Sequence, residues 1–175
     1  LTGLEVYGYN SENQDLRGLL QELATIPGDF QLKLESGKAE HLLRSKDFIK
    51  VFAHPKFFHW LHLSLFSGSE KILTKLDCPN HKNALLDFIQ ELRTAIPDLT
   101  ISTDIVVGHP EEIDEDHWES LQLLKRINPD TITLYQFAAF PNTPVAHLPP
   151  LPEEIINQRL KTIYDLSQNM AKIQN

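Results

Sequence analysis

Apolar and polar residues alternate from Trp60 to Phe66, and this run ends in Ser67-Gly68-Ser69 before a helical pattern begins. Alternation with a period of two is typical of a strand, and the small polar residues predict a turn that leads into a helix. The stretch 100–107 repeats this order, because its apolar residues run into a Gly-containing bend and then into an acidic helix start. Two strand ends of this kind predict one shared site.

The rest of the chain also alternates between strand and helix patterns. Shorter strands are predicted at 1–6, 30–34 and 131–137. Apolar residues at helical spacing lie between the strands, over 16–23, 40–52, 70–76, 85–92, 114–127 and 153–173, with Asp114 as the expected N-cap of its helix. This order predicts an α/β fold with a parallel sheet, either open or rolled into a partial barrel, and a site at the C-terminal ends of the strands.

Composition narrows the class of protein. The chain has 175 residues, of which 41% are hydrophobic, and this is enough for one domain with a sizeable core. Its net charge of -8 does not attract polyanions, so any RNA contact must be local. The single cysteine, Cys78, excludes a disulfide framework and an all-cysteine metal site within the chain, and it fits a reducing, cytoplasmic setting. No apolar run is long enough for a membrane span, and the start at Leu1 suggests a piece of a longer protein.

The two predicted turns carry the first candidate chemistry. Ser67, Gly68 and Ser69 can present hydroxyls and backbone N–H groups to a carboxylate or phosphate at a helix start, although plain N-capping by a serine is the more ordinary interpretation. In the second turn, Gly108 would let the backbone pass close to a ligand, and Glu112 could bind an amine or a ribose. The alternative for these acids is that they favour the start of a helix.

Two polar residues within the predicted strands are further candidates. Asp104 lies in an apolar strand, where an unpaired carboxylate is costly, so we expect it to face the barrel interior or a strand end. His62 shares a strand face with Trp60 and Ser64 and could line a pocket, although a histidine satisfied within the core is the commoner outcome. The spacing of the histidines is poor evidence for a metal, so no metal site is predicted.

Several ordered segments resemble the radical-SAM methylthiotransferases, which insert a methylthio group into tRNA adenosine derivatives or into a ribosomal-protein aspartate. Residues 1–9 are similar to the family's L-T-G-x-[DNE]-x-G-x-Y element, and 60–70 to its H-L-H-L-P-L-Q-S-G-S-D. Residues 96–112 resemble I-P-x-L-x-I-S-T-D-I-I-V-G-F-P-G-E, and 137–146 occupy the place of Y-S-P-R-P-G-T-P-A. The first two segments are closest to the threonylcarbamoyl-adenosine type.

The resemblance implies a radical-SAM partial barrel, a TIM-like fold with parallel strands and outer helices, which uses S-adenosylmethionine and a 4Fe-4S cluster. The cluster cysteines of the family lie upstream of the L-T-G element, so the full-length protein would hold the cluster and this chain would not. Residues 1–150 are then a barrel fragment without its first strand and cluster loop, and 151–175 a helix leading out of the barrel. The full-length protein would bind tRNA, and no catalytic residue is assigned. The resemblance implies that the cofactor is contacted by Ser67, Gly68, Ser69, Asp104, Gly108 and Glu112. It also implies a pocket that is lined by Thr2, Glu5, Ser36 and His62.

Departures from the family pattern keep other functions open. Phe66, His109, Glu111 and Phe140 stand where the family has Gln, Phe, Gly and Arg. Loss of an amide and of a basic contact favours the alternative of a diverged, non-catalytic domain that serves as an RNA-binding or interaction scaffold. A third interpretation is an unrelated (βα)-barrel lyase or aldolase, for which Lys33 is the plausible strand-end lysine.

Overall fold

The computed structural model describes residues 1–3, 5–35, 37–44, 47–78 and 81–173, with the backbone alone for 171–173. The chain forms two compact units that we describe separately. Unit 1 contains Leu1–Ser64 and Asn80–Ser102, and unit 2 contains Leu65–Pro79 and Thr103–Asn175. Each unit is therefore built from two separate stretches of the chain.

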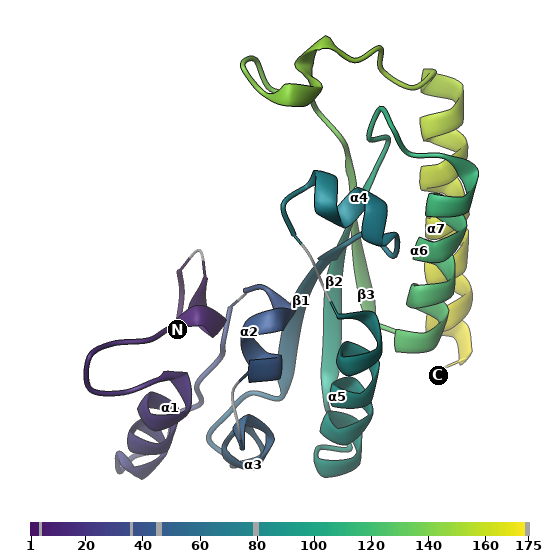
Figure 1. The fold of residues 1–175 in the computed structure, drawn as a ribbon. Coiled ribbons are helices and arrows are strands. Elements are labelled where there is room, and N and C mark those ends of the chain that lie inside the picture. Colours follow the sequence, from purple (N-terminus) through teal and green to yellow (C-terminus); the bar gives the residue numbers. More distant parts are fainter. Residues whose placement is uncertain (4, 36, 45–46, 79–80, 174–175) are drawn as a thin grey trace. The chain divides into compact units, whose positions relative to one another are not determined.

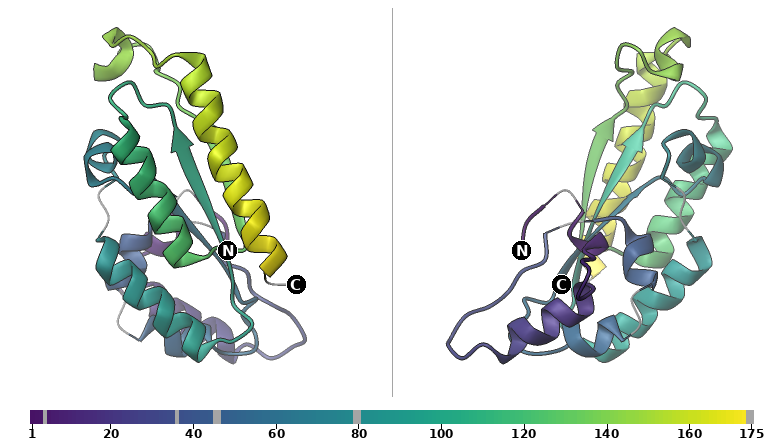
Figure 2. Two further views of the ribbon diagram at one scale, coloured as in Figure 1. Left: turned by 90° about the vertical axis from the view of Figure 1, so that its right-hand side faces the viewer. Right: turned by 60° about the vertical axis from the view of Figure 1, so that its left-hand side comes forward.

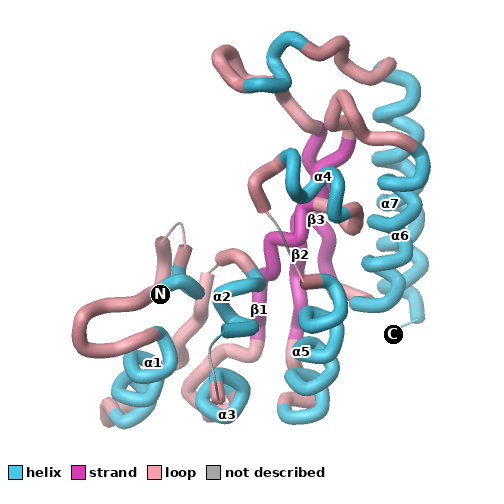
Figure 3. The backbone as a smooth tube through the Cα atoms, in the orientation of Figure 1, coloured by secondary structure: helices cyan, strands magenta, loops and turns pink. Residues whose placement is uncertain are grey.

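A three-stranded parallel sheet supplies the strand ends of interest (Figure 3). The strands β1 (Trp60–Phe66), β2 (Thr100–Val107) and β3 (Thr131–Gln136) are adjacent in that order. In β1 every second residue is buried, because successive side chains of a strand point to opposite faces. The predicted strands at 60–66 and 100–107 are confirmed, and the third ends one residue earlier than expected.

The described part of unit 1 contains four α-helices, which contact one another in pairs, α1 with α3, α2 with α5 and α3 with α5 (Figure 1). They are α1 (Leu16–Thr25), α2 (Ala39–Arg44), α3 (Phe48–Phe52) and α5 (Lys82–Ala95). The core is apolar and aromatic, and the rings of Phe48 and Phe52 stack with centroids 5.2 Å apart. The α/β class predicted from the alternating pattern is confirmed.

Three details of unit 1 correct the sequence predictions. The expected strand at 1–6 is absent from the described residues, where a short 3-10 helix, η1 (Val6–Gly8), follows instead. The expected strand at 30–34 is reduced to one isolated parallel bridge between Leu32 and Phe57. The helix expected over 40–52 forms two separate helices, α2 and α3, and Asp47 precedes the second with a left-handed φ of 63°.

Unit 2 contains the C-terminal ends of β1 and β2, the whole of β3, and the helices that follow these strands. These helices are α4 (Glu70–Lys75), α6 (Asp114–Ile127), the 3-10 helix η2 (Pro144–His147) and α7 (Glu153–Ile173). Helix α7 packs along β3 and α6 (Figures 1 and 2). The extents predicted for α6 and α7 are confirmed, but Asp114 is not the N-cap of α6. That position is Ile113, and its N–H donates to the carboxylate of Asp116 over 2.9 Å.

Among the helices in the described ranges, none has the length and apolar character needed to cross a membrane.

Candidate functional site at the strand ends

The Ser67-Gly68-Ser69 turn leaves β1 through a tight bend at Phe66. Phe66 has a φ of 59°, and the Ser67 N–H donates to the carbonyl of Leu65 over 2.7 Å, which closes a three-residue turn. Such turns are rare for residues other than glycine, because a Cβ crowds the backbone at positive φ. The bend directs the next three residues, all of them buried, toward α6.

The polar groups of this turn bind other parts of unit 2. The Gly68 N–H donates to the hydroxyl of Ser120 on α6 over 2.8 Å, and the Ser67 hydroxyl lies 3.2 Å from the same oxygen. Ser69 is the N-cap of α4, and its hydroxyl also donates to Asp116 over 2.6 Å. The structure thus shows the capping role for Ser69, while contact of the turn with a cofactor stays a prediction.

Asp116 joins the two predicted turns. Its carboxylate accepts hydrogen bonds from Ser69 and from the backbone of Ile113, and it forms an ion pair with Lys71 of α4 over 2.5 Å. Burial opposes ionisation, but these three donors hold the pKa of Asp116 below its usual range. The turns after β1 and β2 therefore meet at Asp116 of α6, while a shared binding site at these strand ends stays a prediction.

The turn after β2 is held by a buried ion pair. Gly108 has a φ of 96°, and its N–H donates to the Glu112 carboxylate over 2.8 Å. Arg159 of α7 donates to the same carboxylate oxygen over 3.0 Å and to Asp114 over 2.8 Å. Burial raises the pKa of Glu112, and the Gly108 N–H and Arg159 counter this rise only in part.

Arg159 was missed by the sequence analysis. Its helix buries Ile156 and Ile163, three residues before it and four residues after it, so Arg159 lies on the apolar face of α7. A charged residue on such a face indicates a buried partner, and this signal is visible in the sequence.

A cavity of about 930 Å³ opens at the ends of β2 and β3. Its walls come from four segments of unit 2: α4 and the residues after it, the end of β2 with its acidic turn, the end of β3, and the Pro-rich stretch before α7. The lining is largely apolar, and its apolar members include Leu76, Val106, Phe137, Phe140, Val145 and Leu148. A volume and lining of this kind suit a small organic ligand.

His109 is the buried polar residue of this cavity. Its Nδ1 accepts a hydrogen bond from the Glu111 N–H over 3.2 Å, and its ring lies 4.8 Å from that of Phe137. Burial lowers the pKa of His109, so we assign a neutral ring with its proton on Nε2. Within the described part of the chain, Nε2 is buried and has no hydrogen-bond partner. His109 therefore offers one unused donor at the cavity wall.

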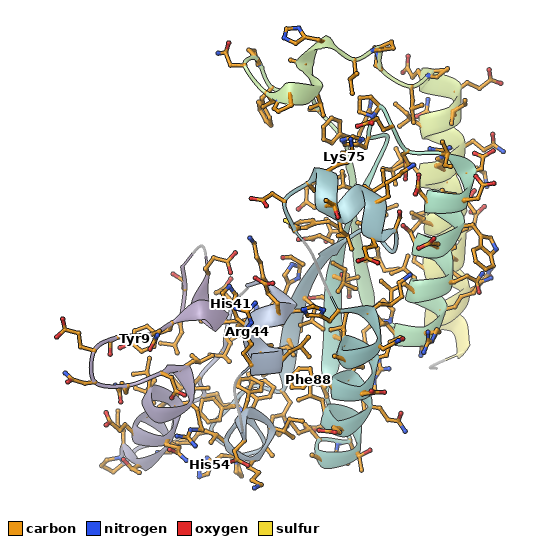
Figure 4. The ribbon with its side chains drawn as sticks, in the orientation of Figure 1. Tyr9, His41, Arg44, His54, Lys75 and Phe88 are labelled. Atoms are coloured by element: carbon orange, nitrogen blue, oxygen red, sulfur yellow. The ribbon has the colours of Figure 1, made fainter. Side chains whose placement is uncertain are left out.

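An ion pair lies beside His109. Lys75, at the end of α4 in Figure 4, contacts the carboxylate of Glu111 over 2.9 Å. The hydrogen bond from Lys75 holds the pKa of Glu111 below its usual range. Lys71, one turn earlier on α4, donates to the Glu111 carbonyl over 2.9 Å. Helix α4 is thus fastened to the turn after β2.

The predicted pocket residues of unit 1 have different surroundings. Glu5 accepts a hydrogen bond from the Lys38 N–H over 3.1 Å, and its carboxylate lies 3.8 Å from His41 of α2, which Figure 4 labels. His62 stacks on Trp60 with ring centroids 5.9 Å apart, and its Nδ1 lies 2.9 Å from the Ser102 hydroxyl. Thr2, a further predicted pocket residue, is exposed. Ser36, the last of this set, lies outside the described residues.

The last predicted residue, Asp104, is half-buried on β2. It belongs to unit 2 together with Ser67, Gly68 and Ser69, and with the turn at 108–112. The structure therefore places the six predicted cofactor residues in one unit, and the described pocket residues Thr2, Glu5 and His62 in the other.

Two buried histidines predict a pH dependence of stability. Burial lowers the pKa of His117 from its ordinary value of 6.5, Arg159 lowers it further, and Asp114 opposes this shift. Burial also lowers the pKa of His109. As the pH falls from about 7.5 to about 5.5, the unfolded chain then binds more protons than the folded chain does. The free energy of unfolding should therefore fall over that range.

Urea unfolding measured across this range by circular dichroism tests the prediction. A His117→Phe variant should lose part of the pH dependence, whereas His147→Phe, at an exposed position, should keep all of it. Equal slopes for the two variants would show that His117 does not titrate in the expected way.

No family model matches the chain. Sequence comparison finds a probable threonylcarbamoyladenosine tRNA methylthiotransferase of Archaeoglobus fulgidus, which is 28% identical over 94% of this chain and 39% of its own length. A tRNA-2-methylthio-N(6)-dimethylallyladenosine synthase of Sulfurihydrogenibium is 31% identical over 98% of this chain and 40% of its own length. Along almost its whole length the chain is similar to tRNA methylthiotransferases of these two kinds. It spans about two fifths of the length of these relatives.

Structure comparison supports the predicted fold. Coproporphyrinogen III oxidase from Escherichia coli, which is described as a radical SAM enzyme, matches with a TM-score of 0.65 over 89% of this chain and 36% of its own. The identity is 14%, so the match concerns the fold alone. It confirms the predicted partial TIM-like barrel.

The residues of this 175-residue chain do not fit an iron–sulfur cluster. Cys78 is its one cysteine, and three thiolates are the ligands that the resemblance implies. Over the described ranges, the structure contains no group of three or more histidine, cysteine or acidic residues that could hold a metal ion. We therefore derive no step of a reaction through a cluster on this chain.

Proposed function

We propose that the chain is part of a radical-SAM methylthiotransferase that adds a methylthio group to a modified adenosine in tRNA. The observation that carries the proposal is the match of almost the whole chain to tRNA methylthiotransferases of two kinds. The full-length protein would act in the cytoplasm with S-adenosylmethionine and a 4Fe-4S cluster bound outside this chain. S-adenosylmethionine supplies the radical in such enzymes, and the protein supplies orientation and exclusion of water.

The chain's own residues suit that supporting role. In this proposal residues 1–150 form a barrel fragment and 151–175 a helix leading out of it. The turns at Ser67–Ser69 and Gly108–Glu112, together with Asp104, would contact the cofactor. Thr2, Glu5, Ser36 and His62 would line a pocket. The cavity beside His109 offers an apolar wall and one buried donor, which can orient a nucleoside by a single hydrogen bond while keeping water out.

Mass spectrometry of tRNA nucleosides tests the proposal. The protein carrying this sequence is produced from its natural gene, reconstituted anaerobically, and supplied to tRNA from a strain that lacks its own methylthiotransferase. We expect a methylthio mass increase on a modified adenosine. S-adenosylmethionine cleavage without this increase would contradict the methylthio transfer, and the absence of both would contradict radical chemistry.

A non-catalytic RNA-binding or interaction scaffold is the second candidate. It is favoured by Glu111, which replaces a family glycine and is engaged with Lys75, and by Phe140, which replaces a family arginine and is 70% exposed. This alternative expects tRNA binding by the reconstituted protein without cleavage of S-adenosylmethionine. The lyase interpretation gains no support, because Lys33 is exposed and its ammonium lies 3.8 Å from the centroid of the Trp60 ring.

A further inference from the structure

The cavity at the ends of β2 and β3 has a distinctive balance of charge. Of the described residues that line it, Lys75 is the one lysine or arginine, while Asp77 and Glu111 are acids. His109 is neutral because burial lowers its pKa. One positive and two negative groups leave the lining with an excess of one negative charge.

The single cation of the lining is already occupied. Lys75 Nζ lies 3.0 Å from Oε1 and 2.9 Å from Oε2 of Glu111, so both carboxylate oxygens face the ammonium group. Glu111 is fixed further by its backbone, because its carbonyl accepts from Lys71 and its N–H donates to His109. A ligand carboxylate could reach Lys75 only by displacing Glu111 or by sharing the ammonium with it.

The other described walls hold no further cation, and their polar members Thr74, Tyr135, Gln136 and Thr143 are neutral. These walls also include the aromatic rings of Phe137 and Phe140 and the aliphatic side chains of Leu76, Val106 and Val145. His109 Nε2 can donate to one neutral acceptor. The lining therefore suits a neutral, mainly hydrocarbon group with one hydrogen-bond acceptor nearby.

We propose that Glu111 is a specificity-determining residue, which neutralises Lys75 and makes the cavity accept a neutral hydrocarbon substituent on adenosine and reject one that carries a carboxylate. The inference rests on the proposed function, since it takes the ligand to be a modified adenosine. It separates the two kinds of substrate named for the relatives. A dimethylallyl group is a neutral branched hydrocarbon, whereas a threonylcarbamoyl group ends in the carboxylate of an amino acid.

The closeness of residues 1–9 and 60–70 to the threonylcarbamoyl type does not bear on this choice. None of the described residues in those two segments lines the cavity. The position that decides the charge of the lining is Glu111, where the family pattern has glycine. With glycine there, Lys75 would be free to pair with a ligand carboxylate.

The rejection has a simple electrostatic origin. A carboxylate that entered beside Lys75 would lie next to the displaced carboxylate of Glu111, and like charges at close range in a partly dehydrated site repel. A hydrocarbon group meets no such penalty and removes apolar surface from water. We expect the neutral nucleoside to bind at least about tenfold more tightly than the carboxylate-bearing one.

Titration calorimetry of the full 175-residue chain with two nucleosides tests the proposal. The probes are N6-dimethylallyladenosine and N6-threonylcarbamoyladenosine at near-physiological ionic strength. In Glu111→Gln the affinity for the carboxylate probe should rise about tenfold, because Lys75 is released, while the affinity for the neutral probe should stay within about twofold. Combining this change with Lys75→Met should abolish the gain.

Glu115→Gln is the matched control, since it removes the same charge from an exposed residue of α6 that does not line the cavity. It should leave both affinities unchanged. Equal or tighter binding of the carboxylate probe by the unaltered chain would overturn the proposal, as would a Glu111→Gln variant with an unchanged ratio of affinities, or the failure of both probes to bind. A preference for the neutral probe without methylthio transfer to tRNA would instead support the specificity and contradict the proposed reaction.

Discussion

Replacing Arg159 with methionine should lower the free energy of unfolding by about 3 to 5 kcal/mol at neutral pH. Arg159 is buried, and it is the cationic partner of Glu112 among the described residues of unit 2. Methionine keeps much of the apolar stem but leaves the Glu112 carboxylate buried without that partner. An uncompensated buried charge is among the most destabilising changes that a single substitution can make.

The loss should depend on pH in a defined direction. Burial already raises the pKa of Glu112, and removing Arg159 raises it further. A folded-state pKa above the unfolded value favours the fold at low pH, and this benefit disappears as the pH rises through the folded-state value. The variant should therefore be closer to the parent chain at about pH 5 than at about pH 7.

Urea unfolding followed by circular dichroism provides the measurement. Lys161→Met is the matched control, because Lys161 lies on the same helix and pairs with Asp165 at the surface over 2.5 Å. Exposed pairs of this kind contribute about 1 kcal/mol or less. If the Arg159 and Lys161 variants lost the same stability, the buried ion pair would not be what fastens α7 to the turn after β2.

Gly68→Ala is the second change with a large expected effect, a loss of about 3 kcal/mol or more in the free energy of unfolding. A Cβ at this position would lie 2.4 Å from the Glu119 carbonyl oxygen and 2.5 Å from the Cα of Ser120. Both are backbone atoms of α6, so they cannot rotate away as a side chain would. The turn and the helix would have to separate, and the hydrogen bond from Gly68 to Ser120 would weaken.

Gly3→Ala is the control for the glycine substitution, because the nearest atom to its added Cβ is Val6 Cγ2 at 3.7 Å. This is ordinary van der Waals contact, and the stability should change by no more than about 0.5 kcal/mol. The same urea titration compares the two variants. A stable Gly68→Ala chain would mean that the close packing of this turn on α6 is not required for folding.

The local pattern of apolar and polar residues was sufficient to predict an element where that element is buried against the sheet along its length. The strand at 60–66 alternates because one of its faces is covered, and α7 was predicted with its correct bounds from the spacing of its apolar residues. Pattern was insufficient at residues 1–6, which have the alternation of a strand. A strand needs a neighbour along its length, and the backbone hydrogen bonds between this segment and 33–35 in the described residues are made at Leu1, with Lys33 and Glu35.

The candidate site was predictable in part for the same reason. The position of the Ser67–Ser69 turn followed from the end of an alternating run. Its partners Asp116 and Ser120 lie about fifty residues further along, and nothing in the local sequence links them to the turn. Distant pairing of this kind is set by the packing of α6, which periodicity describes only as a helix with one buried face.

The division of the chain into interleaved stretches bears on how it is synthesised and dissected. Residues 65–79 of unit 2 leave the ribosome before unit 1 has received its last segment, Asn80–Ser102. Helix α4 must therefore wait for α6, about forty residues later, before Ser69 and Lys71 can meet Asp116. Contacts so distant in sequence slow folding, because a long loop must close first. For the same reason neither unit can be excised as one continuous polypeptide, and a cut at any boundary between them would divide at least one of the two.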